Sequence, residues 1–162
     1  MKILVIADTH IPDFAASLPA GLAGPLRRCD LILHAGDVTR VEVLEDLAGH
    51  APVRVAMGNN DRPEVAAWGA EREVHVEAAG VAIAMVHDSG PRPGRERRLA
   101  NRFPDARLLI FGHSHIPVDE RVGRQRLFNP GSPTWKRREP APTYGWVTVT
   151  GGRMRTRIVP LD

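Results

Sequence analysis

The sequence predicts an α/β fold that begins with parallel strands and continues with antiparallel ones. Short apolar runs of strand length recur along the chain, segments with helical spacing separate the first three of them, and glycine turns join most of the later ones. The 162 residues are 43% hydrophobic, which is enough apolar surface for a real core, so we expect residues 1–162 to form one domain.

The N-terminal half is expected to form a βαβαβ unit. Its runs at 3–7, 31–33 and 53–56 are largely apolar on both faces, which is typical of buried parallel strands. The segments 18–28 and 41–48 between them have the spacing of helices. Because parallel neighbours need a crossover connection, this order of elements predicts a parallel sheet.

The C-terminal half is expected to be mostly antiparallel, because turns that contain glycine join its strand-like runs in pairs. The pairs are 74–78 with 81–86 across Ala79-Gly80, 118–122 with 126–128 around Gly123, and 144–150 with 154–159 across Gly151-Gly152. A further run at 108–111 precedes His113, a short helix is expected over 95–102, and the proline-rich stretch 130–142 predicts a loop.

Polar residues with metal-ligand chemistry stand where the predicted strands end. In chain order the segments are Asp8-Thr9-His10, Gly36-Asp37, Gly58-Asn59-Asn60-Asp61, His87 and Gly112-His113-Ser114-His115. Ligands of open α/β sheets bind beyond the carboxyl ends of the strands, so these segments are expected to converge. The donors are oxygen and imidazole without thiolate, and this set suits Mn, Fe, Ni, Co or Zn.

The spacing of these residues suggests how their side chains converge. Asp8 and His10 would face one side if the chain stays extended, and His113 and His115 repeat that spacing. Glycine stands directly before three of the ligand positions and permits tight backbone paths without Cβ clashes. A carboxylate such as Asp37 can bridge two cations through its two oxygens.

The pattern D-x-H, G-D, G-N-x-D, H, G-H-x-H from Asp8 to His115 resembles that of the calcineurin-like metallophosphoesterases. The chain is also similar to their small YfcE-like prokaryotic phosphodiesterase branch in its short length, in V-H-D-S-G around His87 and in F-N-P-G-S at 128–132. The resemblance implies a four-layer αββα sandwich of two mixed β-sheets flanked by helices.

The resemblance also implies two divalent metal ions, with manganese expected first. One ion would be held by Asp8, His10, Asp37 and His115, and the other by Asp37, Asn59, His87 and His113, with Asp37 as the bridge. Two divalent ions, two aspartates and a bridging hydroxide leave a net positive charge that attracts a phosphoester. The implied activity is therefore a phosphodiesterase that hydrolyses small phosphodiesters by attack of that hydroxide.

Position 60 departs from the wider family. Many members carry a histidine there that assists the leaving group, whereas this chain has Asn60, which we assign a catalytic and substrate-binding role together with the catalytic Asp37. An amide cannot act as a general acid, although it can donate a hydrogen bond to a phosphate oxygen. We therefore expect good rates only for esters with acidic leaving groups. Asn129, Gly131 and Ser132 are further expected to cradle the phosphate or its second ester arm.

Several polar and aromatic residues carry a structural expectation instead. Asp61 precedes Arg62-Pro63 and is expected to be a helix N-cap. His34 lies in an apolar run and is expected to be a core histidine or one that supports a ligand, whereas Asp88 is read as a turn carboxylate or a hydrogen-bond partner of a ligand imidazole. Trp135 is expected to be a packing residue.

Charge and composition narrow the partners. The net charge of +3 comes from scattered arginines, so we expect no nucleic-acid partner, and the apolar N-terminal run is too short to span a membrane. Cys29 stands alone, which favours a reducing cytoplasmic compartment. The sequence is compatible with a monomer or a homo-oligomer. One alternative function is a nuclease. Another is a non-catalytic scaffold, because a eukaryotic retromer subunit resembles this fold but has lost metal ligands.

Overall fold

The computed structural model describes residues 1–161 and contains two five-stranded sheets, ordered β10-β9-β1-β2-β3 and β4-β5-β6-β8-β7. The strands are β1 (Lys2–Ile6), β2 (Leu31–His34), β3 (Val53–Val55), β4 (Val74–Ala78), β5 (Val81–Met85), β6 (Leu108–Ile110), β7 (Val118–Val122), β8 (Gln125–Asn129), β9 (Thr143–Thr150) and β10 (Arg153–Pro160). The helices are the 3₁₀ helix η1 (Ala20–Leu22), α1 (Ala23–Leu26), α2 (Val41–Ala48), α3 (Pro63–Trp68) and α4 (Arg95–Arg102).

The first sheet confirms the predicted βαβαβ unit. Strands β1, β2 and β3 are parallel neighbours, and helices lie between them in the chain. The C-terminal hairpin of β9 and β10 joins the same sheet, with β9 antiparallel to β1. The sheet is mixed because the hairpin returns to the edge that β1 leaves open.

The three hairpins predicted for the C-terminal half are present and antiparallel, but the second sheet also has a parallel centre that was not predicted. Its central strands β5, β6 and β8 are parallel to one another, and only the edge strands β4 and β7 are antiparallel to their neighbours. Strand β6 is buried along its whole length, as central parallel strands are. The hairpin turns at Ala79-Gly80 and Gly123 were recognised in the sequence, but the crossover through α4 sets the direction of the central strands.

The helices over 41–48 and 95–102 have the predicted bounds. The helix predicted over 18–28 is shorter, because η1 starts only after Pro19 and α1 ends at Leu26. Two glycines and Pro25 in this stretch weaken its helical propensity, which accounts for the short turns.

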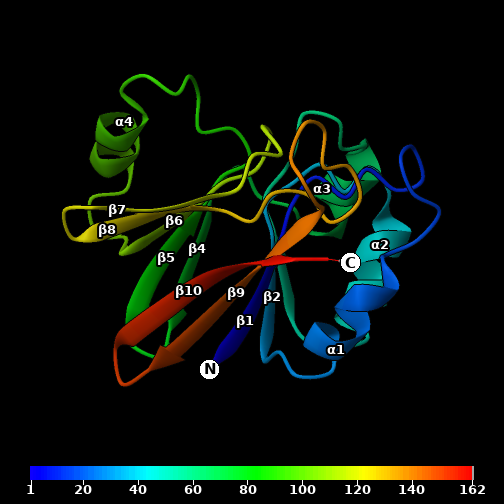
Figure 1. Ribbon diagram of the computed structural model, residues 1–162, viewed down its shortest axis with the longest axis horizontal. Coiled ribbons are helices and arrows are strands. Elements are labelled where there is room, and N and C mark those ends of the chain that lie inside the picture. The colour runs from blue at the N-terminus through cyan, green and yellow to red at the C-terminus, as the bar shows by residue number, and fades with distance from the viewer. Residues whose placement is uncertain (162) are drawn as a thin grey trace.

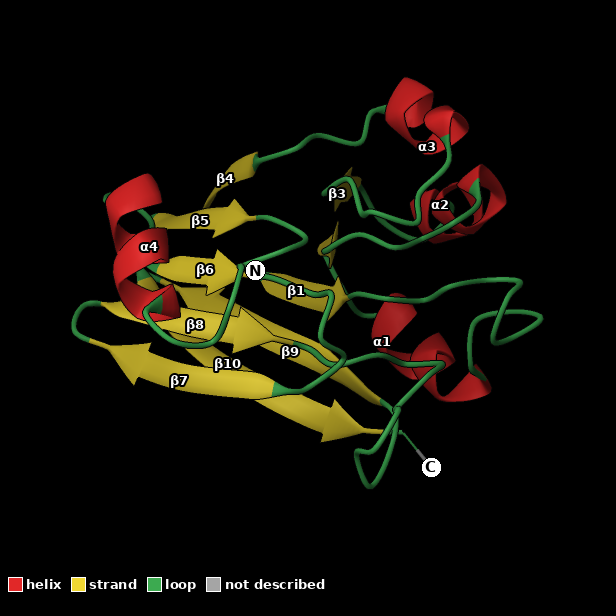
Figure 2. Ribbon diagram, turned by 90° about the horizontal axis from the view of Figure 1, so that it is seen from above, coloured by secondary structure: helices red, strands yellow, loops and turns green. Residues whose placement is uncertain are grey.

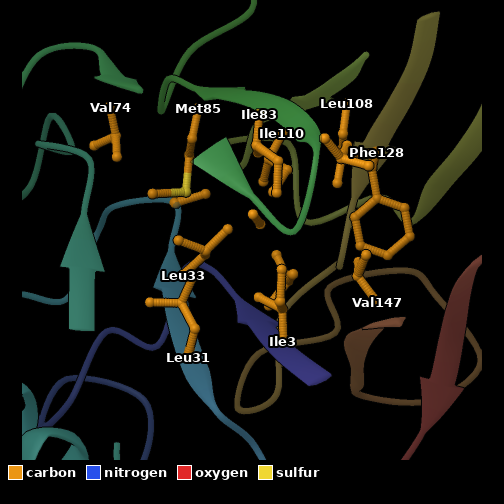
Figure 3. Close-up of a cluster of buried hydrophobic side chains, with 14 of the residues drawn as sticks. Ile3, Leu31, Leu33, Val74, Ile83, Met85, Leu108, Ile110, Phe128 and Val147 are labelled. Atoms are coloured by element: carbon orange, nitrogen blue, oxygen red, sulfur yellow. The ribbon is translucent and has the colours of Figure 1, made fainter. Parts of the chain in front are cut away.

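The sheets and helices form four layers. Helices α1, α2 and α3 lie on one side of the molecule and α4 on the opposite side (Figures 1 and 2). Between the sheets, Ile3 and Leu33 of the first sheet point toward Ile83, Met85 and Phe128 of the second (Figure 3). Separate apolar clusters join each sheet to its own helices. The predicted four-layer sandwich of two mixed sheets is confirmed.

Strand direction decides where a site can form. In Figure 1, β1 rises from the N-terminus toward the side where the long loops gather. Because β2, β5 and β6 also carry loops at their carboxyl ends, the loops after both sheets can meet across the top of the sandwich. Across residues 1–161, none of the helices combines the length and apolar character needed to cross a membrane.

Candidate metal centre

The predicted ligands follow the carboxyl ends of strands from both sheets. Asp8 and Asp37 come shortly after β1 and β2 of the first sheet, and His87 and His113 come shortly after β5 and β6 of the second. Asn59 follows β3. The centre therefore lies where the two sheets meet, and neither sheet builds it alone.

Three of the predicted ligands lie together in one half of the candidate centre, which we call the buried half: Asp8, His10 and His115. All three side chains are buried. Nε2 of His10 lies 3.3 Å from Nε2 of His115, and Nε2 of His115 lies 3.5 Å from Oδ1 of Asp8. Donor atoms this close together, on side chains from opposite ends of the chain, match a shared cation.

The other four predicted ligands lie together in the second half, which we call the paired half: Asp37, Asn59, His87 and His113. Oδ1 of Asn59 lies 2.9 Å from Nε2 of His87 and 3.0 Å from Nδ1 of His113. Nε2 of His87 lies 3.4 Å from Oδ2 of Asp37. Asn59 and His113 are exposed, so this half opens to solvent.

Asp37 lies between the two halves. Its Oδ2 is 3.5 Å from Nε2 of His10 and 3.4 Å from Nε2 of His87, so one oxygen faces an imidazole of each half. Asp8 is also shared, since donor atoms of Asp8, His10 and His115 and those of Asp8, Asp37 and His87 each lie within 4.8 Å of one another. Both carboxylates can therefore neutralise two cations placed side by side.

The buried half contains a carboxylate that a cation would stabilise. Asp8 is fully buried, and burial raises the pKa of its carboxyl to about 7. Its Oδ2 is one of two buried side-chain polar atoms in the described chain that lack a hydrogen-bond partner. An orphaned buried carboxylate oxygen costs free energy, and a metal ion would remove that cost. The residues present therefore fit the divalent ions that the resemblance implies.

The imidazoles are oriented toward the centre by carbonyl groups behind them. His87 donates its Nδ1 proton to the carbonyl of Ala35 at 2.8 Å, and His115 donates to the carbonyl of Trp135 at the same distance. Each ring is thereby fixed with Nε2 facing the other ligands. Burial lowers the pKa of His10, and it lowers the pKa of His115 to about 4, so both rings are neutral and ready to bind a metal.

The paired half satisfies its own charges. Burial alone would raise the pKa of Asp37, but the hydrogen bond and charge of His87 and the hydrogen bonds of Asn60 hold it well below its usual range. Burial opposes the charged form of His87 as well, yet Asp37 raises the pKa of its imidazole to about 8. Asp37 and His87 thus form a buried ion pair that a metal would replace.

Left-handed backbone turns bring the ligands together, which corrects the expectation of an extended chain. The φ angle is positive at Asp8 (55°), His10 (43°), Asp37 (56°), His113 (68°) and His115 (61°). Such angles cost roughly 1–3 kcal/mol each for residues other than glycine. Hydrogen bonds from the amide of Asp8 to the carbonyl of Gly36 and from that of His10 to the carbonyl of Asp37 hold these turns.

The glycines before the ligands are required by close approaches, as the sequence predicted. A Cβ at Gly58 would lie 2.1 Å from the amide nitrogen of Asp37, and one at Gly36 would lie 2.6 Å from Nδ1 of His87. A Cβ at Gly112 would lie 3.0 Å from Oδ2 of Asp8. Each glycine therefore leaves room for a ligand that comes from a different segment.

Asp61 is not the predicted N-cap. The residue that caps α3 is Arg62, and Asp61 instead accepts hydrogen bonds from the amides of Asp37, Thr39 and Gly58 at 3.1, 2.8 and 2.6 Å. Its carboxylate joins the loop after β2 to the loop after β3. The sequence does not reveal this role, because a helix N-cap and an acceptor for amides of other segments both call for a carboxylate at a turn.

The remaining predicted site residues have other surroundings. Asn60 donates from Nδ2 to Oδ2 of Asp37 at 2.7 Å. Asn129 and Ser132 are buried and bonded to the protein: Asn129 donates to the carbonyl of Gly112, and Ser132 donates to the carbonyl of Asp8. The amide of Gly131 donates to Oδ1 of Asn129. Asn129, Gly131 and Ser132 therefore support the loops that carry the predicted ligands.

Two residues outside the ligand set, His34 and Asp88, have the surroundings that the sequence predicted. His34 is fully buried, bonds Oγ1 of Thr9 through Nε2 and accepts the amide proton of Gly36 through Nδ1, and burial lowers its pKa to about 3. Asp88 accepts the amide proton of Gly90 and is an ordinary turn carboxylate.

Trp135 does more than pack. Its ring stacks on that of exposed Phe14, with 3.7 Å between the ring centroids, and meets the rings of His10 and His115 edge to face. Trp135 therefore covers one side of the buried half.

Known proteins are similar to this chain in sequence. A profile of the calcineurin-like phosphoesterase superfamily domain matches residues 1–152. A probable metallophosphoesterase of Methanothermobacter thermautotrophicus is 38% identical over 138 residues, which cover 83% of this chain and 78% of that protein. Another, from Methanocaldococcus jannaschii, is 35% identical over 137 residues, which cover 83% of this chain and 69% of that protein.

Solved structures share the fold. Wild-type Vps29 of Entamoeba histolytica in complex with zinc is 23% identical and has a TM-score of 0.78, with 99% of each chain covered. Chaetomium thermophilum Vps29 is 19% identical and has a TM-score of 0.81, with 98% of this chain and 97% of that chain covered. The profile match and the archaeal relatives together show that this chain belongs to the calcineurin-like phosphoesterase superfamily, in its small prokaryotic branch.

Proposed function

We propose that the protein is a phosphodiesterase that hydrolyses small phosphodiesters with two divalent metal ions, manganese first among them. The observation that carries this proposal is the place of Asp37, whose Oδ2 faces His10 on one side and His87 on the other. When bound, two such ions supply an activated water and positive charge at the phosphoryl group. The ligand assignment is the one that the sequence predicted for Asp8, His10, Asp37, Asn59, His87, His113 and His115.

The protein's own groups favour an anionic substrate. Of the seven proposed ligands only Asp8 and Asp37 are acidic, so their two negative charges do not cancel a pair of divalent cations. The exposed Asn59 and His113 leave the paired half open to an incoming ester. The stacked rings of Phe14 and Trp135 lie against His10 of the buried half.

Asn60 is proposed to hold the substrate. It is exposed, and its Nδ2 group donates to the oxygen of Asp37 that faces both halves, so a second N–H of the same amide can reach a phosphate oxygen there. It cannot protonate a departing alkoxide. We therefore propose that the protein prefers esters with acidic leaving groups, and that Asn129, Gly131 and Ser132 act by holding the ligand loops.

The test combines metal analysis with turnover. Chelated protein should be inactive toward bis(p-nitrophenyl) phosphate and should regain activity as Mn²⁺ is added up to two equivalents. Asp37→Asn, which keeps the shape of the side chain, should lose both bound metal and turnover. Full turnover by verified metal-free protein would overturn the proposal, and cleavage of single-stranded DNA at comparable rates would favour a nuclease.

A second candidate function is a non-catalytic module that holds metal. The zinc complex of a Vps29 with this fold favours it as the alternative. Two bound metal equivalents without hydrolysis of any phosphoester would support that module over the phosphodiesterase.

A further inference from the structure

A groove of about 410 Å³ opens beside the paired half of the centre. Its lining includes the proposed ligand His113 and its neighbour Ser114, together with Ser89, Arg92 and Arg95. Ser89 and Arg92 belong to the loop that leads from β5 into α4, and Arg95 is the first residue of α4, which Figure 2 shows on the outer side of the second sheet. The groove is thus continuous with the proposed metal centre through His113.

Arg95 is a cation without a partner. Its Nε is buried and makes no hydrogen bond, and its guanidinium forms no ion pair with any described residue. The guanidinium carbon instead lies 4.8 Å from the centre of the Phe111 ring, which fixes the plane of the group. A guanidinium that makes no hydrogen bond or ion pair with a described residue keeps N–H donors that an anionic ligand in the groove could use.

The neighbouring Arg98 shows what a structural arginine looks like in this segment. It donates to the carbonyls of Ser89 (3.2 Å) and Pro93 (2.8 Å) and to that of Pro91, so it holds the loop in shape. The loop therefore does not depend on Arg95 for its backbone hydrogen bonds. Arg95 is left free to bind something else.

The charge in the groove favours an anion. Arg92 and Arg95 both line it, and Asp88, the one carboxylate among the lining residues, is engaged by the amide of Gly90. A guanidinium binds phosphate or carboxylate through paired N–H donors, which suits a small anionic group at this position.

We infer that this groove binds a second anionic group, a phosphate or carboxylate, carried on an ester arm of the substrate, and that Arg95 determines this specificity. The inference rests on the proposed phosphodiesterase activity, because the scissile phosphate would lie at the metal centre while the second anion lies in the groove. The substrate class is then a diester with a terminal anion on one arm.

The kinetic test uses two matched esters: p-nitrophenyl butyl phosphate, and its analogue whose butyl arm ends in a phosphate. The Mn²⁺-loaded protein should favour the second ester at least about tenfold in kcat/KM, and Arg95→Met, which keeps the packing on Phe111, should bring that ratio near one. Arg95→Lys should keep part of the preference. The exposed Arg97 on α4 gives the control, since Arg97→Met should leave the ratio and both rates unchanged. Equal rates for the two esters, or an unchanged ratio in Arg95→Met, would overturn the inference.

A binding test separates this inference from the proposed function. Metal-free protein should bind butanediol bisphosphate more tightly than monobutyl phosphate in calorimetry, and Arg95→Met should lose the difference. If neither ester is hydrolysed, the proposed function fails while this binding difference still supports the groove. If hydrolysis occurs but the bisphosphate has no advantage in either assay, the groove inference fails and the proposed function stands.

Discussion

The two halves of the candidate metal centre are built from similar ligands but are stabilised in opposite ways. In the buried half, Asp8 lacks a partner for one oxygen, and burial keeps His10 and His115 neutral. In the paired half, Asp37 and His87 neutralise each other. The buried half thus gains the most from a cation, whereas the paired half is already formed and must give up its own ion pair to bind one.

The two halves also differ in the residues that hold their ligands in place. Left-handed turns and close glycines hold the ligands of both halves, since Asp37 also has a positive φ angle and Gly58 and Gly112 approach Asp37 and Asp8 respectively. The paired half depends in addition on hydrogen bonds, because Asp61 and Asn60 fix the position of Asp37. Changes to these supports should therefore separate the two halves, and we order them by expected effect.

The largest effect is expected from Gly58→Ala. A Cβ at this position would lie 2.1 Å from the amide nitrogen and 2.2 Å from Oδ1 of Asp37, so the paired half must shift. Since a displacement of about 1 Å can cost roughly 100-fold in rate, we expect at least that loss in turnover, together with loss of one of two metal equivalents. Gly24→Ala in α1, where a Cβ meets nothing closer than 3.6 Å, is the control. Equal metal content in both variants would contradict the account.

The next effect is expected from Asp61→Asn. The variant keeps the shape but loses the charge that three amides share, and it places an NH₂ group against one of them. We expect metal affinity of the paired half to fall by about 10- to 100-fold, measured by titration of chelated protein. The exposed Asp46 on α2 offers Asp46→Asn as a matched control. If affinity falls equally in both variants, Asp61 does not position Asp37.

The sequence could predict most of the fold and the residues that gather at the candidate centre, but not how they are supported. Strand-length runs and glycine turns are local signals, so β1 to β3, α2 and α4 were predicted closely. The parallel centre of the second sheet depends on a crossover through α4, which turn residues do not reveal. The role of Asp61 depends on amides from another segment, and the positive φ angles at Asp8 and His10 depend on hydrogen bonds to Gly36 and Asp37.

A smaller effect is expected from Asn60→His, which tests the open face of the paired half. An imidazole at this position can donate a proton to a leaving group, which the amide cannot do. We expect the rate of alkyl ester hydrolysis to rise at least about tenfold, which is less than the roughly 100-fold that a well-placed general acid supplies. The rate for bis(p-nitrophenyl) phosphate should change little. An identical gain on both esters would point to a change in binding instead of proton transfer.

The smallest expected effect concerns stability and pH, through the histidine that links the two halves. His34 bonds Thr9 of the buried half's loop and accepts the amide proton of Gly36 beside Asp37. Burial lowers its pKa from 6.5 to about 3 in the folded protein, so below pH 6.5 the unfolded chain binds a proton that the folded chain does not. This contribution is therefore intact above pH 6.5 and is lost as the pH falls toward 3, by about 1.4 kcal/mol per pH unit. His10 and His115 act in the same direction, whereas Asp8, whose pKa is raised to about 7, acts in the opposite one, so it is the difference between wild type and the His34 variant that isolates His34. Urea unfolding of metal-free protein between pH 4 and 7 should show the slope, and His34→Asn, which keeps an acceptor for Gly36 but does not titrate, should be less stable at pH 7 with a shallower slope. An unchanged slope would mean that His34 is protonated in the folded protein and that the link between the halves is not the neutral imidazole.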